Sequence, residues 1–364
     1  MISLKVDGPL NFLGDDVLKA AVFIEPRKVD VREVAKPQIQ KPTDAIIRIV
    51  RACVCGSDLW WYRGITEREP NSLIGHEAIG IVETVGSAVD QVKPGDFVIV
   101  PFTHGCGHCS ACLAGFDGDC LNKESGSNGG YQGEYLRYTN ANWALVKIPG
   151  DPKSYSDAQL NSLLTLADVM ATGYHAAISA EVKPGSTVVV MGDGAVGLCG
   201  VIAANLLGAK RIIAMSRHEQ RQKLAREFGA TDIVPERDDA AVERVMALTE
   251  QRGADAVLEC VGSKQSIDTA IRVGHAGAVV GRVGLPQDAE VDTDYLFSRN
   301  IGLRGGIAAV TTHDRAVLLE AVLSGKINPG KVFTQRFDLD HIEEAYQAMD
   351  QRQAIKSLIT VSAI

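Results

Sequence analysis

The sequence lacks an excess of positive charge. Its 37 Lys and Arg residues stand against 45 Asp and Glu residues, which gives a formal net charge of -8. A chain of this charge has no general attraction for nucleic-acid phosphates or anionic lipid headgroups. We therefore expect neither nucleic acid nor a membrane among its partners.

Long hydrophobic runs are also missing. No run reaches the roughly 18 apolar residues that a membrane-spanning helix needs. Residues 1–19 carry Asp and Gly where a secretory signal needs a continuous apolar core. We find no internal repeat, low-complexity tract or Pro/Ser-rich linker. These absences predict a cytoplasmic protein that is not built from repeats.

The length and composition are those of a globular protein with a real core. Hydrophobic residues make up 46% and charged residues 23% of the sequence. A chain of 364 residues is long for one ordinary domain and suits two. We expect two domains that share a cleft.

The first half is rich in predicted strands. Short runs of apolar and polar residues are bounded by Pro, Gly or Asp, a pattern typical of strands, at residues 20–34, 44–54, 78–86, 95–102 and 134–139. The pattern changes at residues 160–180, where the apolar residues have helical spacing. Residues 315–326 and 341–349 predict helices and residues 332–337 and 356–362 predict strands, and we expect these to return to the first domain.

Between these parts, buried strands and helices alternate, which predicts a parallel, doubly wound sheet and therefore an α/β fold. The predicted strands are residues 187–192, 211–216, 232–234, 255–262, 278–284 and 303–306. The predicted helices between them are residues 196–209, 219–229 and 240–250.

A glycine motif lies where this sheet begins. Gly192, Gly194 and Gly197 form G-x-G-x-x-G between an apolar strand and a helix that starts with Ala195 and Val196. In that context the glycines allow a tight turn, close approach of the backbone to a pyrophosphate and close helix packing. The motif predicts a dinucleotide site, and an ordinary glycine turn is the alternative.

The end of the next strand bears on which dinucleotide binds. NAD-binding folds carry an acidic residue there that binds the ribose hydroxyls. This chain has Ser216 and Arg217, with Arg221 one helical turn further on. A hydroxyl and guanidinium groups suit a 2′-phosphate, so we expect NADP rather than NAD. The alternative is that both arginines belong to a solvated helix face.

Eight cysteines occur, and four of them, Cys106, Cys109, Cys112 and Cys120, lie within fifteen residues. Four thiolates at this spacing can close around zinc. Such a site has a net charge of minus two and no open position, so its role would be structural. An iron-sulfur cluster or reactive thiols are the alternatives.

A second group of ligand types lies upstream. Cys55, Ser57 and Asp58 fall in one short segment, and His76 and Glu77 in another. A thiolate and an imidazole on separate segments leave room for a third ligand and a substrate. Alternatively, Cys55 is a small buried residue and His76 a core histidine.

Together with the cysteine cluster and the glycine motif, the segment GHEAIGIVETVG at residues 75–86 resembles the zinc-dependent medium-chain alcohol dehydrogenases. The resemblance implies a GroES-like, strand-rich catalytic domain at 1–169 and 307–364, with a structural zinc lobe at about 104–121. It further implies a Rossmann domain at 170–306 and a catalytic zinc in the cleft between the two domains.

The resemblance also implies roles for single residues. Cys55 and His76 match ligands of the catalytic zinc, Glu77 a carboxylate that can reach the metal, and Asp58 the partner that orients His76. At the third ligand position many members have cysteine. This chain has Asp168 there, which is similar to the aspartate of formaldehyde dehydrogenase-like members. One thiolate and one carboxylate would still neutralise the dication. The alternative is that Asp168 only begins a helix.

Further residues of the expected site match family positions less specifically. Ser57 occupies the position of a proton-relay hydroxyl, but Trp60 stands where some members have a relay histidine. Trp60, Trp61 and Tyr62 are candidates for an apolar substrate wall. Thr172 matches a residue beside the nicotinamide, and Lys356 a basic residue near the pyrophosphate.

We therefore expect an enzyme with two zinc ions per chain that moves a hydride between NAD(P)(H) and a small alcohol or its aldehyde or ketone. The resemblance implies a homodimer or homotetramer. Two alternatives stay open: a formaldehyde dehydrogenase or dismutase-like enzyme with tightly bound NAD(H), and a non-enzymatic, zinc-bearing nucleotide sensor.

Overall fold

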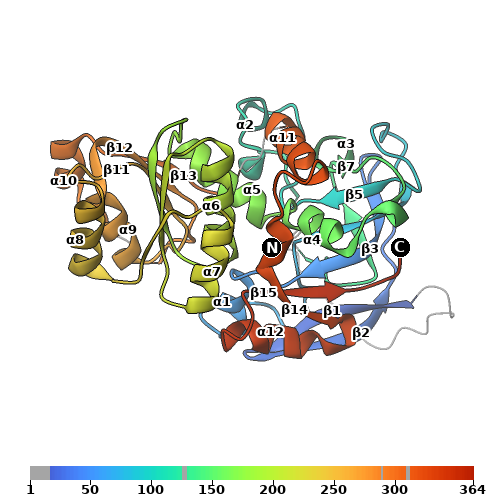
Figure 1. Cartoon of the computed structure of the whole chain (residues 1–364). Coiled ribbons are helices and arrows are strands. Elements are labelled where there is room, and N and C mark those ends of the chain that lie inside the picture. The colour runs from blue at the N-terminus through green and yellow to red at the C-terminus, as the bar shows by residue number, and fades with distance from the viewer. Residues whose placement is uncertain (1–16, 125–128, 288–289, 309–311) are drawn as a thin grey trace. The chain divides into compact units, whose positions relative to one another are not determined.

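The computed structural model describes residues 17–124, 129–287, 290–308 and 312–364. The chain divides into two compact units, Met1–Asp168 with Thr311–Ile364, and Val169–Val310. Figure 1 shows the chain coloured from its N-terminus to its C-terminus. The predicted domain boundaries at residues 169/170 and 306/307 lie close to these divisions.

The first unit contains a two-stranded antiparallel ribbon and a seven-stranded sheet. The ribbon pairs β1 (Val17–Glu25) with β2 (Lys28–Ala35). The sheet has the order β14-β15-β3-β4-β5-β7, and β6 also pairs with β3. Its strands are β3 (Ala45–Cys53), β4 (Ala78–Val85), β5 (Phe97–Val100), β6 (Tyr135–Tyr138), β7 (Val146–Lys147), β14 (Phe333–Asp338) and β15 (Lys356–Thr360). The helices of this unit are α1 (Asp58–Tyr62), α2 (Ser110–Leu113), α3 (Ala141–Ala144), α4 (Asp157–Thr165), α11 (Thr312–Leu323) and α12 (Ile342–Asp350).

The aromatic residues of α1 belong to the core of this unit. Trp61 is 7% exposed, and its ring lies 5.4 Å from the rings of both Phe23 and Tyr346. Tyr62 is 2% exposed and packs 5.2 Å from Tyr346. The prediction that Trp61 and Tyr62 line a substrate wall is therefore wrong, because both pack inside the hydrophobic core. Trp60 is partly exposed.

The second unit is built on a six-stranded sheet in which every pair of neighbours is parallel, with the order β10-β9-β8-β11-β12-β13. This is the order of a doubly wound dinucleotide-binding fold. The strands are β8 (Thr187–Met191), β9 (Arg211–Met215), β10 (Asp232–Val234), β11 (Ala254–Glu259), β12 (Gly274–Arg282) and β13 (Gly302–Gly305).

Helices cover both faces of that sheet. In Figure 1, α6 and α7 lie on one side of it and α8 and α9 on the other. The helices are α5 (Val169–Ser179), α6 (Ala195–Leu206), α7 (Glu219–Glu227), α8 (Asp238–Leu248), α9 (Lys264–Arg272) and α10 (Thr293–Arg299). Our sequence analysis missed α9 and α10. The start of α9 carries a readable signal, because the Ser263 side chain accepts a hydrogen bond from the Ser266 amide as an N-cap.

The predicted helical segment at residues 160–180 is two helices. α4 ends at Thr165 and α5 begins at Val169. Between them, the Ala167 carbonyl accepts a hydrogen bond from the amide of Phe102, at 3.3 Å. That carbonyl is therefore drawn to the segment after β5, and the interruption places Asp168 in a turn at the end of the first unit.

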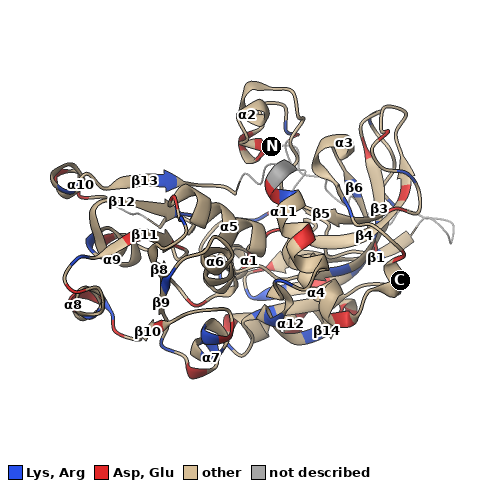
Figure 2. Cartoon of the chain, turned by 45° about the horizontal axis from the view of Figure 1, so that its top comes forward, with Lys and Arg blue, Asp and Glu red and all other residues tan. Residues whose placement is uncertain are grey.

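Charged residues of both signs are interspersed over the described chain (Figure 2). Ion pairs such as Lys19 with Asp340 and Arg272 with Asp268 combine the two signs at the surface. None of the helices among the described residues is long and apolar enough to cross a bilayer.

One glycine sets the distance between α5 and the sheet of the second unit. A Cβ added to Gly281 in β12 would overlap the carbonyl oxygen of Ala176 and lie 2.8 Å from the amide nitrogen of Ala180. We expect Gly281→Ala to lower the free energy of unfolding by about 1–3 kcal/mol, because α5 must move away from the sheet. Urea unfolding measures this loss.

The control is Gly302→Ala in the neighbouring strand β13. A Cβ at Gly302 would lie 3.4 Å from a Val279 methyl group, an ordinary van der Waals distance. Equal stability of the two variants would contradict the close packing of α5.

Candidate metal centres and dinucleotide site

The sheet of the first unit brings two of the candidate ligand segments together. β3 and β4 are antiparallel, and Ala52 pairs with Ala78. Cys55 follows the end of β3, and His76 and Glu77 directly precede β4. The end of one strand and the start of the next are therefore adjacent, and their flanking residues meet at one edge of the sheet.

The next strand brings in the third segment. β5 is antiparallel to β4, and Val100 pairs with Ala78. Just beyond β5, Phe102 is hydrogen-bonded to Ala167, so Asp168 follows at the same edge. Three segments far apart in sequence thus place their ligand types in one cluster.

The distances in this cluster suit a tetrahedral metal ion. The Cys55 Sγ lies 3.6 Å and the His76 Nε2 lies 3.5 Å from the Asp168 Oδ2. Zinc bonds of about 2.0–2.3 Å at tetrahedral angles place ligand atoms about 3.3–3.8 Å apart. Glu77 belongs to the same group, with all four ligand atoms within 4.8 Å of one another. The donors are those zinc prefers, so residues and metal fit.

Asp58 holds His76 from the side away from this cluster. Its Oδ1 lies 3.4 Å from the His76 Nδ1, and its Oδ2 accepts a hydrogen bond from the Cys55 amide at 3.0 Å. Burial alone would raise the pKa of Asp58, but the charge of His76 and these hydrogen bonds lower it overall. A carboxylate on one ring nitrogen leaves the other nitrogen for a metal.

Buried acidic groups dominate the electrostatics of the cluster. Burial raises the pKa of Cys55 and of Glu77, although Lys356 opposes both shifts. For His76, burial lowers the pKa, but Asp58, Asp168 and Cys55 raise it, and the result lies well above the usual value. A cluster with this excess of negative charge favours a bound cation.

Lys356 and Glu77 form a fully buried ion pair. The Nζ of Lys356 lies 2.6 Å from the Glu77 Oε1 and donates to the Val54 carbonyl at 3.1 Å. The side chains are 1% and 0% exposed. These partners use two of the three donors of the Lys356 ammonium, and its place near the pyrophosphate stays a prediction. The Oε2 of Glu77 is buried and has no hydrogen-bond partner among the described residues.

Ser57 lies between Cys55 and Asp58 in the sequence. It is exposed, and as the residue before α1 it makes no side-chain capping bond. The hydroxyl is not used to hold the helix, so it is free to take part in chemistry.

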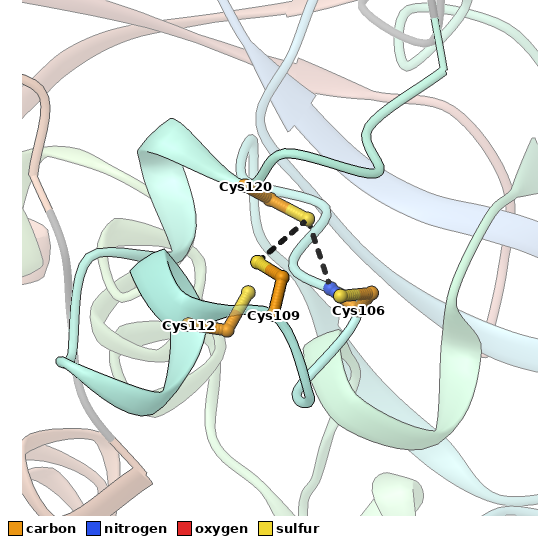
Figure 3. A group of neighbouring side chains, drawn as sticks. All are labelled: Cys106, Cys109, Cys112 and Cys120. Carbon is orange, nitrogen blue, oxygen red and sulfur yellow. Dashed lines mark hydrogen bonds between the residues drawn. The ribbon is translucent and has the colours of Figure 1, made fainter.

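The four cysteines of the lobe converge on one point (Figure 3). Their sulfur atoms all lie within 4.8 Å of one another, and the Sγ atoms of Cys109 and Cys120 are 4.0 Å apart. Four zinc thiolates at about 2.3 Å would be about 3.8 Å apart. The arrangement fits the predicted structural zinc, and all eight cysteines of the chain are free of disulfides.

Amides around the lobe favour thiolates. The Cys120 Sγ accepts from the amides of Cys106, at 3.3 Å, and Asn122, at 3.4 Å. The Asn122 side chain donates to the Cys106 Sγ at 3.3 Å. Backbone hydrogen bonds from Cys112 and Leu121 lower the pKa of Cys109 to about 6. Sequence reasoning missed Asn122, since an amide beside a cysteine motif carries no signal of its own.

The glycine motif follows β8 in the second unit. Gly192 has a φ of +104°, which favours glycine, and a Cβ on Gly197 would overlap the Gly192 carbonyl. Gly194 is the N-cap of α6, and a Cβ there would meet no atom within 4 Å. The N-terminus of α6 thus opens onto free space, which suits a pyrophosphate.

The residues after β9 are arranged differently from our prediction. Ser216 is fully buried, and its Oγ donates to the Oδ2 of Asp193 at 2.8 Å. The Nη1 of Arg221 is 3.1 Å from the Asp193 Oδ1. The Arg221 guanidinium is thus paired through Nη1 with a carboxylate of the glycine motif, and its contact with the dinucleotide stays a prediction. Arg217 is exposed and makes no hydrogen bond or ion pair within the described part of the chain.

Asp193 was missed by the sequence analysis, which considered the glycines of the motif and not the residue between the first two. Thr172 lies in α5 and is 8% exposed. The structure places it in the second unit, near the start of that helix.

Comparisons with known proteins match most of the chain. A family model described as the alcohol dehydrogenase GroES-like domain matches residues 41–150, and one described as zinc-binding dehydrogenase matches residues 195–323. A zinc-type alcohol dehydrogenase-like protein of Bacillus subtilis is 31% identical, over 92% of this chain and 97% of the relative. The NADP-dependent isopropanol dehydrogenase of Thermoanaerobacter brockii is also 31% identical, over 92% and 97%. The solved structure of an alcohol dehydrogenase from Thermus sp. ATN1 is 32% identical with a TM-score of 0.86, and covers 94% of this chain and 100% of that one.

The Lys356–Glu77 pair gives a stability prediction. Lys356→Met leaves the Glu77 carboxylate buried without its cation, so we expect the free energy of unfolding to fall by about 3 kcal/mol. The double variant with Glu77→Gln should recover part of this loss, because no unpaired carboxylate remains. Urea unfolding of the purified proteins measures both.

Lys264→Met is the matched control. Its ammonium is paired with Glu290, but the two side chains are 64% and 86% exposed. We expect this variant to change the free energy by less than about 1 kcal/mol. A Lys356→Met protein as stable as the control would contradict the importance of the buried pair.

Proposed function

Because the chain belongs to the zinc-type alcohol dehydrogenase family, we propose that it moves a hydride between NADP(H) and a small alcohol or its aldehyde or ketone. The observation that carries this proposal is the convergence of Cys55, His76 and Asp168 from three segments, with Asp168 3.6 and 3.5 Å from the other two ligand atoms. The glycine motif of the second unit supplies the dinucleotide part of the proposal.

In this proposal Cys55, His76 and Asp168 hold a catalytic zinc ion. One thiolate and one carboxylate balance the charge of the dication, and three protein ligands leave one tetrahedral position. When bound, zinc acts as a Lewis acid that polarises a substrate oxygen and makes its proton easier to lose. Asp58 keeps the His76 ring oriented and its metal-facing nitrogen unprotonated.

The proton of an alcohol substrate needs an acceptor in the chain. Ser57 is exposed beside Cys55, and its hydroxyl can accept that proton while donating its own to the next group in a relay. The indole of Trp60 is a donor only and cannot accept a proton, so it cannot act as a relay at the position where some relatives have histidine, and the relay must leave Ser57 by another group. The hydride travels to or from the substrate carbon, and the reaction therefore requires the nicotinamide held by the second unit to reach that carbon.

Glu77 has a supporting place in this proposal. Its Oε1 is held by Lys356, and its Oε2 is buried with no partner among the described residues. A cation near Oε2 would compensate this atom, which supports a metal ion in the cluster. The family resemblance likewise gives Glu77 a role as a carboxylate that can reach the metal.

We propose that a second zinc ion is held by the four cysteines of the lobe. Four thiolates leave no open position, and the lobe has little hydrophobic core of its own, so this zinc would stabilise structure rather than perform catalysis. The proposal is two zinc ions per chain.

NADP is proposed as the preferred dinucleotide. Arg217 is exposed at the end of β9, where a 2′-phosphate would lie, and no acidic residue stands at that strand end. The name of the Thermoanaerobacter brockii relative, an NADP-dependent isopropanol dehydrogenase, agrees with this choice.

Some finer points also stay proposals. An aspartate at the third ligand position keeps open the formaldehyde dehydrogenase or dismutase-like alternative, whose distinguishing property is NAD(H) that is retained through dialysis. We further propose a cytoplasmic homodimer or homotetramer. The absence of disulfides among the eight cysteines supports the location, and the family resemblance supports the oligomer.

The third metal ligand can be tested directly. Asp168→Ala removes one of three ligands, so we expect zinc to fall from about two equivalents per chain to about one. Turnover with a panel of alcohols and aldehydes should fall at least about 100-fold, since even the loss of a residue behind a ligand costs 10–100-fold. Metal analysis and steady-state kinetics measure the two effects.

Asp168→Cys is the control for this variant, because it keeps an anionic ligand at the same position and should retain both zinc ions. An Asp168→Ala protein with unchanged zinc content and rate would contradict the proposed ligand set.

The dinucleotide preference gives a separate prediction. Arg217→Asp replaces a cation with an anion at the 2′-phosphate, so the ratio of kcat/KM with NADP to kcat/KM with NAD should fall by about 10–100-fold. Lys223→Asp makes the same charge change at an exposed position in α7 and should leave the ratio within about twofold. Equal ratios in the two variants would show that Arg217 belongs to a solvated face.

A further inference from the structure

The second unit contains a carboxylate at the place where a dinucleotide fold reads the adenosine ribose. In NAD-binding folds an acidic residue at the end of the second strand accepts the ribose hydroxyls. Here that strand, β9, is followed by Ser216, whose hydroxyl donates to Asp193 at 2.8 Å. The Asp193 carboxylate, which comes from the loop after β8, therefore lies one hydrogen bond away from the end of β9.

Asp193 is held firmly and still has capacity to bind. Ser216 donates to one carboxylate oxygen and Arg221 to the other, at 3.1 Å. A carboxylate has about four lone-pair sites, so about two of them stay available. The side chain is 14% exposed, and it lies in the motif that begins α6. A ribose hydroxyl can therefore donate to it, whereas a 2′-phosphate would meet its negative charge.

Two arginines follow the ends of β9 and β10 at the same edge of the sheet. The Ser216 amide donates to the Val234 carbonyl at 3.1 Å, so β9 and β10 run side by side up to these residues. Arg217 follows Ser216 at once, and Arg237 follows Val234 by one short turn. Burial lowers the pKa of Arg237, and the charge of Arg217 lowers it further, while Asp193 raises it. Because Val234 pairs with Met215, both arginines lie just beyond strand ends at the edge of the sheet that carries the glycine motif.

We propose that Asp193 sets the choice between NAD and NADP, by accepting the adenosine ribose hydroxyl of NAD and repelling the 2′-phosphate of NADP, and that Arg237 shares that phosphate with Arg217. This proposal rests on the dinucleotide site of the proposed function and deepens it. Arg217 and Arg237 favour NADP, and the Asp193 carboxylate limits that preference. The chain therefore binds both dinucleotides, with the difference set by three charges.

Neutralising Asp193 should change the two dinucleotides in opposite directions. Asp193→Asn removes the repulsion of the phosphate and releases Arg221, so NADPH should bind more tightly. The amide is a weaker acceptor for the ribose, so NADH should bind more weakly. We expect the ratio of the two dissociation constants to move about tenfold or more toward NADPH. Fluorescence titration of the intact protein with NADPH and with NADH measures both constants without turnover.

Arg237→Ala tests the second half of the proposal. NADPH should bind about tenfold more weakly, because one charge-assisted contact to the phosphate is lost, and NADH should change by less than about twofold. Glu250→Gln is the control for the charge change at Asp193, since its side chain is 81% exposed and pairs with Arg252 in the same unit. It should change neither constant.

The outcomes separate this proposal from the one on which it rests. If the unaltered protein binds neither NADPH nor NADH, the dinucleotide function itself is wrong. If it binds them and Asp193→Asn changes both constants by the same factor, Asp193 only supports the loop and the selectivity proposal is overturned. An Arg237→Ala protein with unchanged NADPH affinity overturns the role of Arg237.

Discussion

The candidate catalytic site depends on a large amount of negative charge buried at one edge of a sheet. Cys55, Glu77 and Asp168 can each carry a negative charge, and Lys356 is the one lysine or arginine ion-paired within this cluster among the described residues. Burying charges is costly unless cations compensate them. The cluster is stable only if its acids stay protonated or if a cation sits among them, and the ligand spacing suits the second solution.

The boundary between the two units lies beside the same cluster. Asp168 is the last residue of the first unit, and Val169 opens both the second unit and α5. The proposed third ligand thus sits on the covalent link between the two units. The hydrogen bond from Phe102 to Ala167 ends the helical run there, so a packing detail of β5 fixes where the ligand lies. A helix that continued through Asp168 would carry its carboxylate along the helix surface instead.

Sequence analysis predicted the features that lie within short segments. It missed those that depend on which strands pair and on how their ends are aligned. The four-cysteine lobe and the glycine motif lie within short segments, where spacing alone decides what can meet. Asp168, His76 and Cys55 come from distant segments, and only the family resemblance joined them. The ion pair of Lys356 with Glu77 was missed because residue type does not reveal that β15 lies beside β3 and buries its first residue against Glu77.

Other misses have the same cause. Trp61 and Tyr62 look like a substrate wall beside Trp60, but α1 turns them toward Tyr346 on α12, more than two hundred residues away in the chain. Asp193 stands between two glycines of a motif that is interpreted through its backbone conformation, so the side chain of Asp193 was not considered. Its importance depends on Ser216 and Arg221, and the parallel pairing of β8 with β9 brings all three to one edge.

The two cysteine-containing sites would bind the same kind of metal ion for different roles, one structural and one catalytic. The difference lies in the charge around the ion. In the lobe, four thiolates would outweigh the dication by two charges, and the amides of Cys106 and Asn122 donate to sulfur instead of a cation. That excess of negative charge leaves little electrophilic character. In the cluster of Cys55, His76 and Asp168, the ligands would balance the dication, and Lys356 absorbs the charge of Glu77. The buried lysine would therefore help to keep a metal ion there positive enough to act on a substrate oxygen.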